Sequence, residues 1–270
     1  MTTGARADRP PTLLAVAHGT RDPDGAAAYR ALAEAVCALR PGLRVELAYL
    51  DLLRPSLDEA LAGLHGPVVL VPLLLGTGYH VRVDIPAALA ATPHLPAVVA
   101  PALGPDPLLA VALAERLTEA GWSAAQGGTV VLAAAGSTDP SANADTAHMA
   151  ELLAGELGRP VIPSYLCAST PAPAEAVAAL HAAGHQQVAV ARYLLTPGYF
   201  ARQAARTDSA LTSAPLGAHE AIARLVLQRY DHMSCAARPP RPATADPAGY
   251  AGRSTAAPAA GPSLAASTSS

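Results

Sequence analysis

The chain has 270 residues, half of them apolar (51%) and few of them aromatic (4%), and it carries a formal net charge of −3. This length suffices for two domains of modest size, each with its own core. Nucleic-acid-binding proteins need clustered basic residues, and membrane-spanning helices need about 20 consecutive apolar residues. The sequence contains no lysine and no such apolar run, so we expect neither a nucleic-acid partner nor a membrane partner.

The N-terminus and the cysteines restrict the class of protein further. Residues 1–10 contain charged side chains and no apolar segment of the secretory type, so we expect a flexible N-terminus and a cytoplasmic protein. The three cysteines, Cys37, Cys167 and Cys235, are odd in number and widely spaced. That pattern is typical neither of a disulfide framework nor of a C-x-x-C metal site.

From Thr12 onward, apolar strands alternate with helices. The expected elements of the first half are the strands Leu13–Ala17, Arg44–Leu50, Val68–Leu75 and Val98–Pro101 and the helices Pro23–Leu39, Pro55–Leu64 and Pro107–Ala120. Alternation of this kind predicts parallel strands joined by right-handed crossovers. The fold class is therefore α/β, with a mostly parallel four-stranded sheet covered by helices, and it resembles a flavodoxin-like layer.

The second half repeats the first. Three stretches match at nearly the same distance along the chain: residues 17–23 with 134–140, residues 49–51 with 165–167, and residues 74–80 with 194–200. Self-similarity on this scale predicts two related lobes in tandem.

The lobe boundaries follow from composition. We expect a first lobe over residues 11–123, which carries the catalytic residues, and a degenerate repeat over residues 128–234, joined by a small polar linker. Residues 235–270 are rich in Pro, Ala and Ser and have almost no large apolar side chain. Such a segment cannot bury enough surface to offset its ordering entropy, so we expect a disordered tail.

Three polar residues follow strand ends in the first lobe. His18 follows the first strand, Asp51 follows the second, and His80 follows the third across the glycine-containing loop of residues 76–78. Ligands of open parallel sheets bind outside the carboxyl ends of the strands, so all three side chains should face one crevice. Two imidazoles and a carboxylate suit a divalent first-row metal ion, and a neutral histidine can also accept a proton.

Each of these residues also has a structural interpretation. A histidine at a strand end can be an ordinary loop or capping residue, and Asp51 can cap the helix that begins near Pro55. Asp22 is expected to cap the first helix, because Asp139 occupies the matching place in the second lobe.

The second lobe tests these alternatives. At the positions of His18, Asp51 and His80 it carries Ala135, Cys167 and Phe200, although it keeps the surrounding glycines, prolines and Tyr-Leu pair. Residues that only maintain the fold should have been kept with them. Their joint loss indicates a shared function in the first lobe, although Cys167 retains the ability to bind a metal as thiolate.

These motifs resemble the sirohydrochlorin chelatases of the small cobalt- and iron-inserting type. The resemblance rests on residues 17–23, on Tyr49-Leu50-Asp51 with Pro55, and on residues 71–86, which contain Gly78-Tyr79-His80-Val81 and Asp84-Ile85-Pro86. It implies a chelatase-like fold and an ATP-independent lyase that inserts Fe²⁺ or Co²⁺ into sirohydrochlorin, in sirohaem or cobalamin biosynthesis. The metal would be a substrate, with no tightly bound cofactor.

The resemblance also implies residue roles. His18 and His80 would bind the metal, and His18, His80 and Asp51 would be the catalytic residues. Asp51 stands where the family more often has Glu, and its shorter side chain favours a water-mediated or indirect role.

The substrate of this family is rich in carboxylates. Arginines near the motifs would orient it, and we name Arg21 and Arg82, together with Gly78, which lets a ligand approach the backbone closely. We expect a monomer that closes its own crevice, with a dimer left open.

Two rival functions remain for comparison. Histidine phosphatases also have His-Gly after a first strand, but they place Arg before the histidine, where this chain has Ala17. A non-catalytic protein that binds or delivers a metal or a tetrapyrrole would use the same residues, and the sequence does not separate it from an enzyme. The metal is open between iron and cobalt, and the lack of a histidine-rich tail favours iron.

Overall fold

The computed structural model describes residues 10–126 and 128–237, and these belong to one compact unit. The expected flexible N-terminus and the expected disordered tail lie outside the described residues, apart from Pro10 and residues 235–237. Residues 235–237 are helical, because the last helix ends at Ala237. Among the described helices, none combines the length and the apolar character needed to cross a bilayer.

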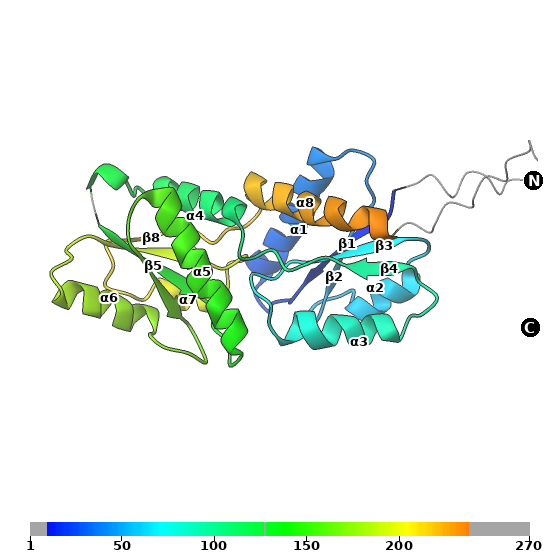
Figure 1. Cartoon of the computed structure of the whole chain (residues 1–270), viewed down its shortest axis with the longest axis horizontal. Coiled ribbons are helices and arrows are strands. Elements are labelled where there is room, and N and C mark those ends of the chain that lie inside the picture. The colour runs from blue at the N-terminus through cyan, green and yellow to red at the C-terminus, as the bar shows by residue number, and fades with distance from the viewer. Residues whose placement is uncertain (1–9, 127, 238–270) are drawn as a thin grey trace, which may run out of the picture. The chain divides into compact units, whose positions relative to one another are not determined.

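Two four-stranded parallel sheets form the framework, as the sequence predicts (Figure 1). The first sheet has the order β2-β1-β3-β4 and the second has the order β6-β5-β7-β8, so the two topologies are the same. The strands are β1 (Thr12–Ala17), β2 (Val45–Tyr49), β3 (Val68–Pro72), β4 (Ala97–Val99), β5 (Thr129–Ala134), β6 (Val161–Tyr165), β7 (Val188–Tyr193) and β8 (Leu211–Thr212). In each sheet the first strand of the repeat is central and buried along its whole length, which explains its unbroken apolar sequence.

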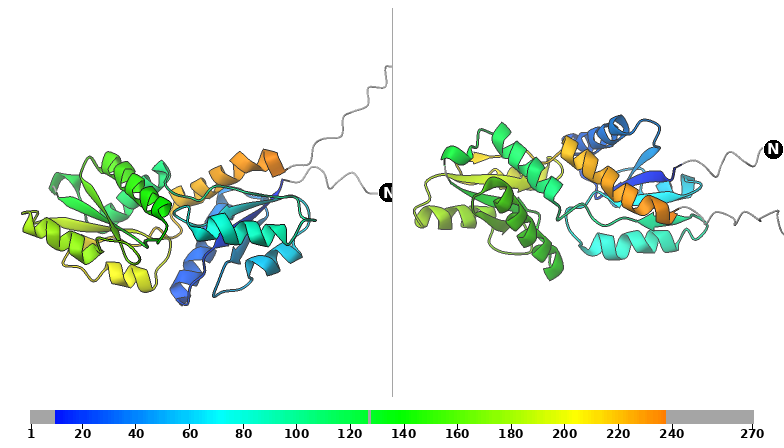
Figure 2. Two further views of the ribbon diagram at one scale, coloured as in Figure 1. Left: turned by 60° about the horizontal axis from the view of Figure 1, so that its bottom comes forward. Right: turned by 45° about the horizontal axis from the view of Figure 1, so that its top comes forward.

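Helices cover both faces of each sheet (Figures 1 and 2). They are α1 (Pro23–Leu39), α2 (Leu57–Gly63), α3 (Ile85–Ala90), α4 (Pro107–Glu119), α5 (Pro140–Leu157), α6 (Pro173–Ala182), α7 (Tyr199–Ala204) and α8 (Glu220–Ala237), with a π-helical turn η1 (His80–Asp84) and a 3-10 turn η2 (Ala124–Gln126).

Three of the longer helices, α1, α4 and α5, begin with an aspartate cap. The side chains of Asp22, Asp106 and Asp139 accept hydrogen bonds from backbone N–H groups in the first turns of α1, α4 and α5, and proline follows each of them. Proline fits the first helical position, where its missing N–H would have no partner. The predicted capping role of Asp22 is confirmed.

One prediction about helix packing is wrong. The helix near 107–120 was expected to cover the first sheet, but α4 packs against α5 and β7 of the second half. The last helix, α8, packs instead against α1, β3 and β4 of the first half (Figure 1). The sequence could not decide this exchange, because both sheets offer similar apolar faces and an amphipathic helix fits either.

The exchange joins the halves through one continuous core. A single cluster of buried residues extends from Leu13 and Val69 in the first sheet through Leu113 of α4 and Ile222 of α8 to Leu132 in the second sheet. Each sheet has a separate, smaller cluster on its other face, under α2 and α3 in the first half and under α6 in the second.

Candidate metal-handling site

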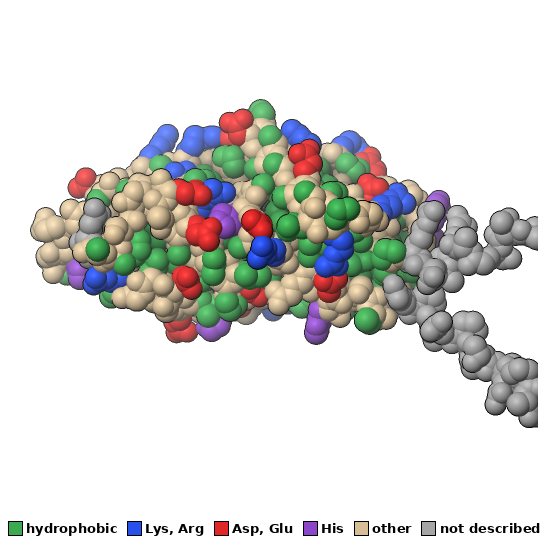
Figure 3. Space-filling view, turned by 90° about the horizontal axis from the view of Figure 1, so that it is seen from above, with side chains coloured by type: hydrophobic (Ala, Val, Ile, Leu, Met, Phe, Trp, Pro, Cys, Tyr) green, Lys and Arg blue, Asp and Glu red, His purple; other side chains and the backbone are tan. Residues whose placement is uncertain are grey.

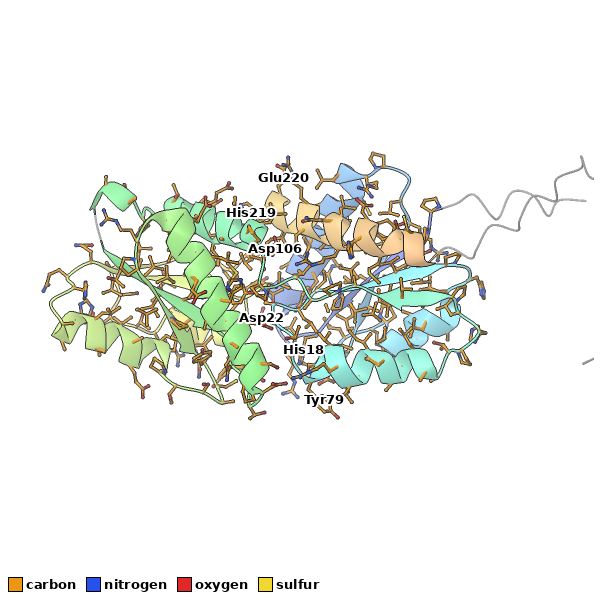
Figure 4. The ribbon with its side chains drawn as sticks, in the orientation of Figure 1. His18, Asp22, Tyr79, Asp106, His219 and Glu220 are labelled. Atoms are coloured by element: carbon orange, nitrogen blue, oxygen red, sulfur yellow. The ribbon has the colours of Figure 1, made fainter. Side chains whose placement is uncertain are left out.

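His18 is the first residue after β1, and backbone hydrogen bonds to the neighbouring strand set its position. The N–H groups of Leu50 and Asp51 donate to the carbonyl oxygens of Ala17 and His18, each over 2.9 Å. Gly19 then turns the chain with a φ of +102°, and a Cβ atom here would overlap the carbonyl oxygen of Asp51. Only glycine fits this turn, so it lets the chain after His18, which Figure 4 labels, pass close to the backbone of Asp51.

His80 lies beyond the end of β3. This strand pairs with β1 on the side opposite to β2. It begins the π-helical turn η1, which continues directly into α3. His80 therefore follows the loop after β3, as the sequence predicts, and it begins a helical turn that the sequence did not predict. A π turn adds one residue to a helical turn and leaves no mark in the apolar periodicity, so sequence patterns do not reveal it; such turns frequently occur at functional sites.

The two histidines meet. Their ring centroids are 4.6 Å apart and the ring planes are perpendicular. Because metal–nitrogen bonds are about 2 Å long, one ion can bond a nitrogen of each ring at this spacing.

The environment keeps His18 neutral. Partial burial lowers the pKa of His18 below its ordinary value of 6.5, and the nearby His80 lowers it further, while the charge of Asp51 acts in the opposite direction. Burial penalises the charged imidazolium. A neutral imidazole has a lone pair for a metal ion or a proton.

Asp51 is near His18, but its side chain is exposed, and its Oδ1 atom accepts a hydrogen bond of 2.7 Å from the N–H of Leu52. Within the residues that the structure describes, no three His, Cys, Asp or Glu side chains are grouped closely enough to hold a metal ion. Among the described residues, the groups that the site offers a metal are therefore the ring nitrogens of His18 and His80.

Asp84 is the residue that the sequence reasoning missed. Its Oδ2 atom lies 2.5 Å from Nδ1 of His80, and both side chains are about two-fifths exposed. The signal was available, because residues four positions apart share a helical face. No helix over residues 80–84 was expected from the sequence, so this spacing predicted no pair there.

The expected substrate-binding residues have different surroundings. Arg21 is exposed. A Cβ atom on Gly78 would meet no heavy atom within 4 Å, so the backbone is open there. Arg82 pairs with Asp139 and donates to Oγ of Ser141 over 3.0 Å, which gives its guanidinium a partner that a substrate carboxylate would have to displace.

Exposed apolar side chains flank the histidine pair. Leu52 is 46% exposed, Tyr79 is 63% exposed and Val83 is 42% exposed. Leu52 lies in the loop that holds Asp51, and the other two lie on either side of His80 in sequence. Large apolar side chains in contact with water around one polar pair favour binding of a flat apolar surface.

The second half keeps this backbone without the ligands. The N–H groups of Leu166 and Cys167 donate to Ala134 and Ala135 over 2.9 Å, just as their counterparts do in the first half. Gly136 also has a positive φ, of +88°, and a Cβ atom there would overlap the carbonyl oxygen of Cys167. The fold of this turn therefore does not require the histidine.

Comparison with protein families gives one match of wide extent. The model of the CbiX family matches residues 12–120 and, again, residues 129–233. The two matched segments coincide with the internal repeat.

Two individual relatives share less than a third of their aligned residues with this chain. The chain is 29% identical over 196 residues to a sirohydrochlorin ferrochelatase of Priestia megaterium, covering 69% of this chain and 73% of that protein. It is 27% identical over 123 residues to a sirohydrochlorin cobaltochelatase of Methanosarcina acetivorans, covering 40% of this chain and 95% of that protein. The structure of SirB from Bacillus subtilis with Fe³⁺ superposes with a TM-score of 0.70 at 24% identity, covering 83% of this chain and 96% of that one, so the two share a fold.

Proposed function

The chain belongs to the CbiX family, and from that premise we propose that it inserts a divalent metal ion, Fe²⁺ or Co²⁺, into sirohydrochlorin with release of two protons. The observation that carries the proposal is the His18–His80 pair, whose ring centroids are 4.6 Å apart. Two relatives are named for iron and cobalt insertion into this tetrapyrrole.

The small number of protein ligands suits a metal that is passed on. A metal held by four protein groups would be trapped, as in structural sites. An ion bonded to two imidazoles keeps its other positions for water and then for pyrrole nitrogens, so the tetrapyrrole can replace the protein ligands in turn. The metal is thus a substrate of the reaction.

The histidines also supply a path for the protons. Each metal ion that enters the macrocycle displaces the protons of two pyrrole N–H groups. His18 is neutral in the folded protein because burial lowers its pKa, so it can accept one of these protons once the metal has left it. Asp51, exposed and close to His18, offers a route from this imidazole to water.

The apolar rim orients the macrocycle. Leu52, Tyr79 and Val83 contact one flat face of the tetrapyrrole, which places its nitrogens over the histidines. Arg21 binds peripheral carboxylates, and the open backbone at Gly78 accepts the edge of the ring. Holding both reactants in this geometry contributes to the rate by removing the entropic cost of their encounter.

An anaerobic absorbance assay tests the proposal. Sirohydrochlorin is mixed with Fe²⁺ or Co²⁺, with and without the protein, and the insertion rate is compared among wild type, His18→Ala and His80→Ala. Each substitution is expected to reduce the enzymatic rate about 10²- to 10⁴-fold, the range of a positioned acid–base group. His148→Ala, at an exposed histidine on α5, is the control and should leave the rate unchanged.

Asp51→Ala is a further arm of this assay. Because one oxygen of Asp51 is engaged by Leu52, we expect a loss of about tenfold, smaller than that of either histidine variant. An equal or larger loss would make Asp51 a principal catalytic residue.

The two rival outcomes are distinct. A protein-dependent shift in the tetrapyrrole spectrum without metal insertion would replace the enzyme by a tetrapyrrole carrier. A rate above background that survives both histidine substitutions would move the reaction to another site.

A further inference from the structure

His80 and Asp84 form an i, i+4 pair on the turn η1, with Oδ2 of Asp84 2.5 Å from Nδ1 of His80. An ionised carboxylate only accepts hydrogen bonds. The Nδ1 atom of a neutral His80 must then carry the proton, and the lone pair must reside on Nε2. The contact thus selects one of the two tautomers of the imidazole and restricts rotation of the ring.

An ordinary structural role does not explain Asp84. It directly precedes α3, yet within the described residues its side chain makes no capping hydrogen bond to that helix. It is two-fifths exposed, so it does not fill the core either. Within the part of the chain that the structure describes, the contact of its carboxylate is the one with His80.

The second half supports a shared role for the pair. At the positions of His80 and Asp84 it has Phe200 and Ala204, so both members of the pair are absent together. Between them, Arg202 matches Arg82 and is kept. A carboxylate that served only the helix should have been kept as well.

We propose that Asp84 is a positioning residue that holds His80 in the Nδ1–H tautomer and presents Nε2 to the incoming metal ion. The inference rests on the proposed function for the identity of that ion. Carboxylates that accept a hydrogen bond from a metal-binding histidine fix the ring and raise the basicity of its other nitrogen. The two imidazoles thus present a lone pair for different reasons. Partial burial favours the neutral form of His18, and the contact with Asp84 fixes the tautomer of His80.

Asp84→Asn is the sharpest variant, because asparagine has the same shape but its amide can also donate, which permits the wrong tautomer. Binding of Co²⁺ alone to the full-length protein, measured by titration calorimetry, is expected to weaken about 10- to 100-fold. Asp84→Glu retains a carboxylate and should recover part of the affinity. Glu151→Gln, at the His148–Glu151 pair on α5, is the matched control and should bind Co²⁺ as wild type does.

A second readout follows the tautomer directly. In metal-free protein at mildly alkaline pH, ¹⁵N NMR of the imidazoles should show His80, assigned by its absence in His80→Ala, with Nδ1 protonated. In Asp84→Asn the resonances should move to a mixture of tautomers, with the melting temperature unchanged.

Wild-type Co²⁺ affinity and an unchanged tautomer in Asp84→Asn would overturn the inference even if the enzyme inserts metal. Conversely, weakened Co²⁺ binding in Asp84→Asn would support it even if the wild type proves to bind metal without insertion. The experiments therefore distinguish failure of the positioning role of Asp84 from failure of the proposed insertion activity.

Discussion

At the scale of single residues, His18 couples the site to the stability of the fold. Burial and the adjacent His80 lower its pKa below 6.5, whereas in the unfolded chain His18 titrates near the ordinary value. Between these two pKa values the unfolded state binds more protons than the folded state. The free energy of unfolding therefore rises with pH in that window. It falls on acidification because the unfolded chain takes up the proton first, and the decrease ends once the native imidazole is protonated as well.

We expect this part of the pH dependence of the free energy of unfolding to disappear when His18 is replaced by a residue that does not titrate. Between about pH 7 and about pH 5, the free energy of unfolding of metal-free wild type should fall more steeply than that of His18→Gln. Urea unfolding in the presence of a chelator measures both curves. Parallel curves for the two proteins would mean that folding does not shift the pKa of His18.

At the scale of elements, two ion pairs at equivalent places of the repeat connect the two halves of the chain. Arg82 on η1 pairs with Asp139, the cap of α5, and Arg202 on α7 pairs with Asp22, the cap of α1. The hydrogen bond from Arg202 lowers the pKa of Asp22. The contacts are equivalent in the repeat, but only the turn of Arg82 also carries a histidine of the site.

This difference predicts unequal effects of equal substitutions. Arg82→Gln should weaken binding of Co²⁺, measured without tetrapyrrole, by about three- to tenfold, because it loosens the turn that carries His80. Arg202→Gln removes the equivalent pair without touching η1 and should change Co²⁺ affinity little. Both should alter stability only modestly, because more than half of each arginine side chain is exposed and water screens the pair. Equal losses of affinity would show that the contact between the halves, and not η1, governs the site.

At the scale of the whole molecule, the exchanged helices make the two halves depend on each other. The guanidinium of Arg116 on α4 donates to the carbonyl oxygen of Leu216, and that of Arg229 on α8 donates to those of Ala102 and Leu103. Arg229 also binds Asp106, the cap of α4. Asp106 and His219 lie where α4 and α8 begin (Figure 4).

The face seen from above carries acidic, basic and histidine side chains side by side (Figure 3). How much each ion pair contributes to stability therefore depends on how far its side chains are buried. The side chains of Arg229 and Asp106 are 18% and 13% exposed, whereas Arg224 and Glu220, also on α8, are 64% and 62% exposed. Water therefore screens the Arg224–Glu220 pair much more strongly than the Arg229–Asp106 pair.

Arg229→Ala should therefore lower the free energy of unfolding by about 1.5–3 kcal/mol, because it leaves a partly buried carboxylate and two carbonyl oxygens without their donor. Arg224→Ala on the same helix should change it by about 0.5 kcal/mol or less. Denaturant unfolding measures both, and a similar cost for the two would contradict the role of Arg229 in joining the halves. A single transition is expected, since one core spans both sheets.

The sequence by itself determined the parallel sheets, the capped start of α1 at Asp22 and the repeat, because these depend on local periodicity and on contacts within a few residues. It also brought His18 and His80 to one edge of one sheet, since parallel strands end together. The turn that carries His80, the partner of Arg82 and the exchange of α4 with α8 were decided only by the tertiary structure. The turn η1 and its His80–Asp84 contact are local, but five residues of π-helix are too short to leave an apolar periodicity. The pairing of Arg82 with Asp139 and the exchange of the helices join segments that are far apart in sequence, and shape and charge in the folded chain select them without any periodic signal.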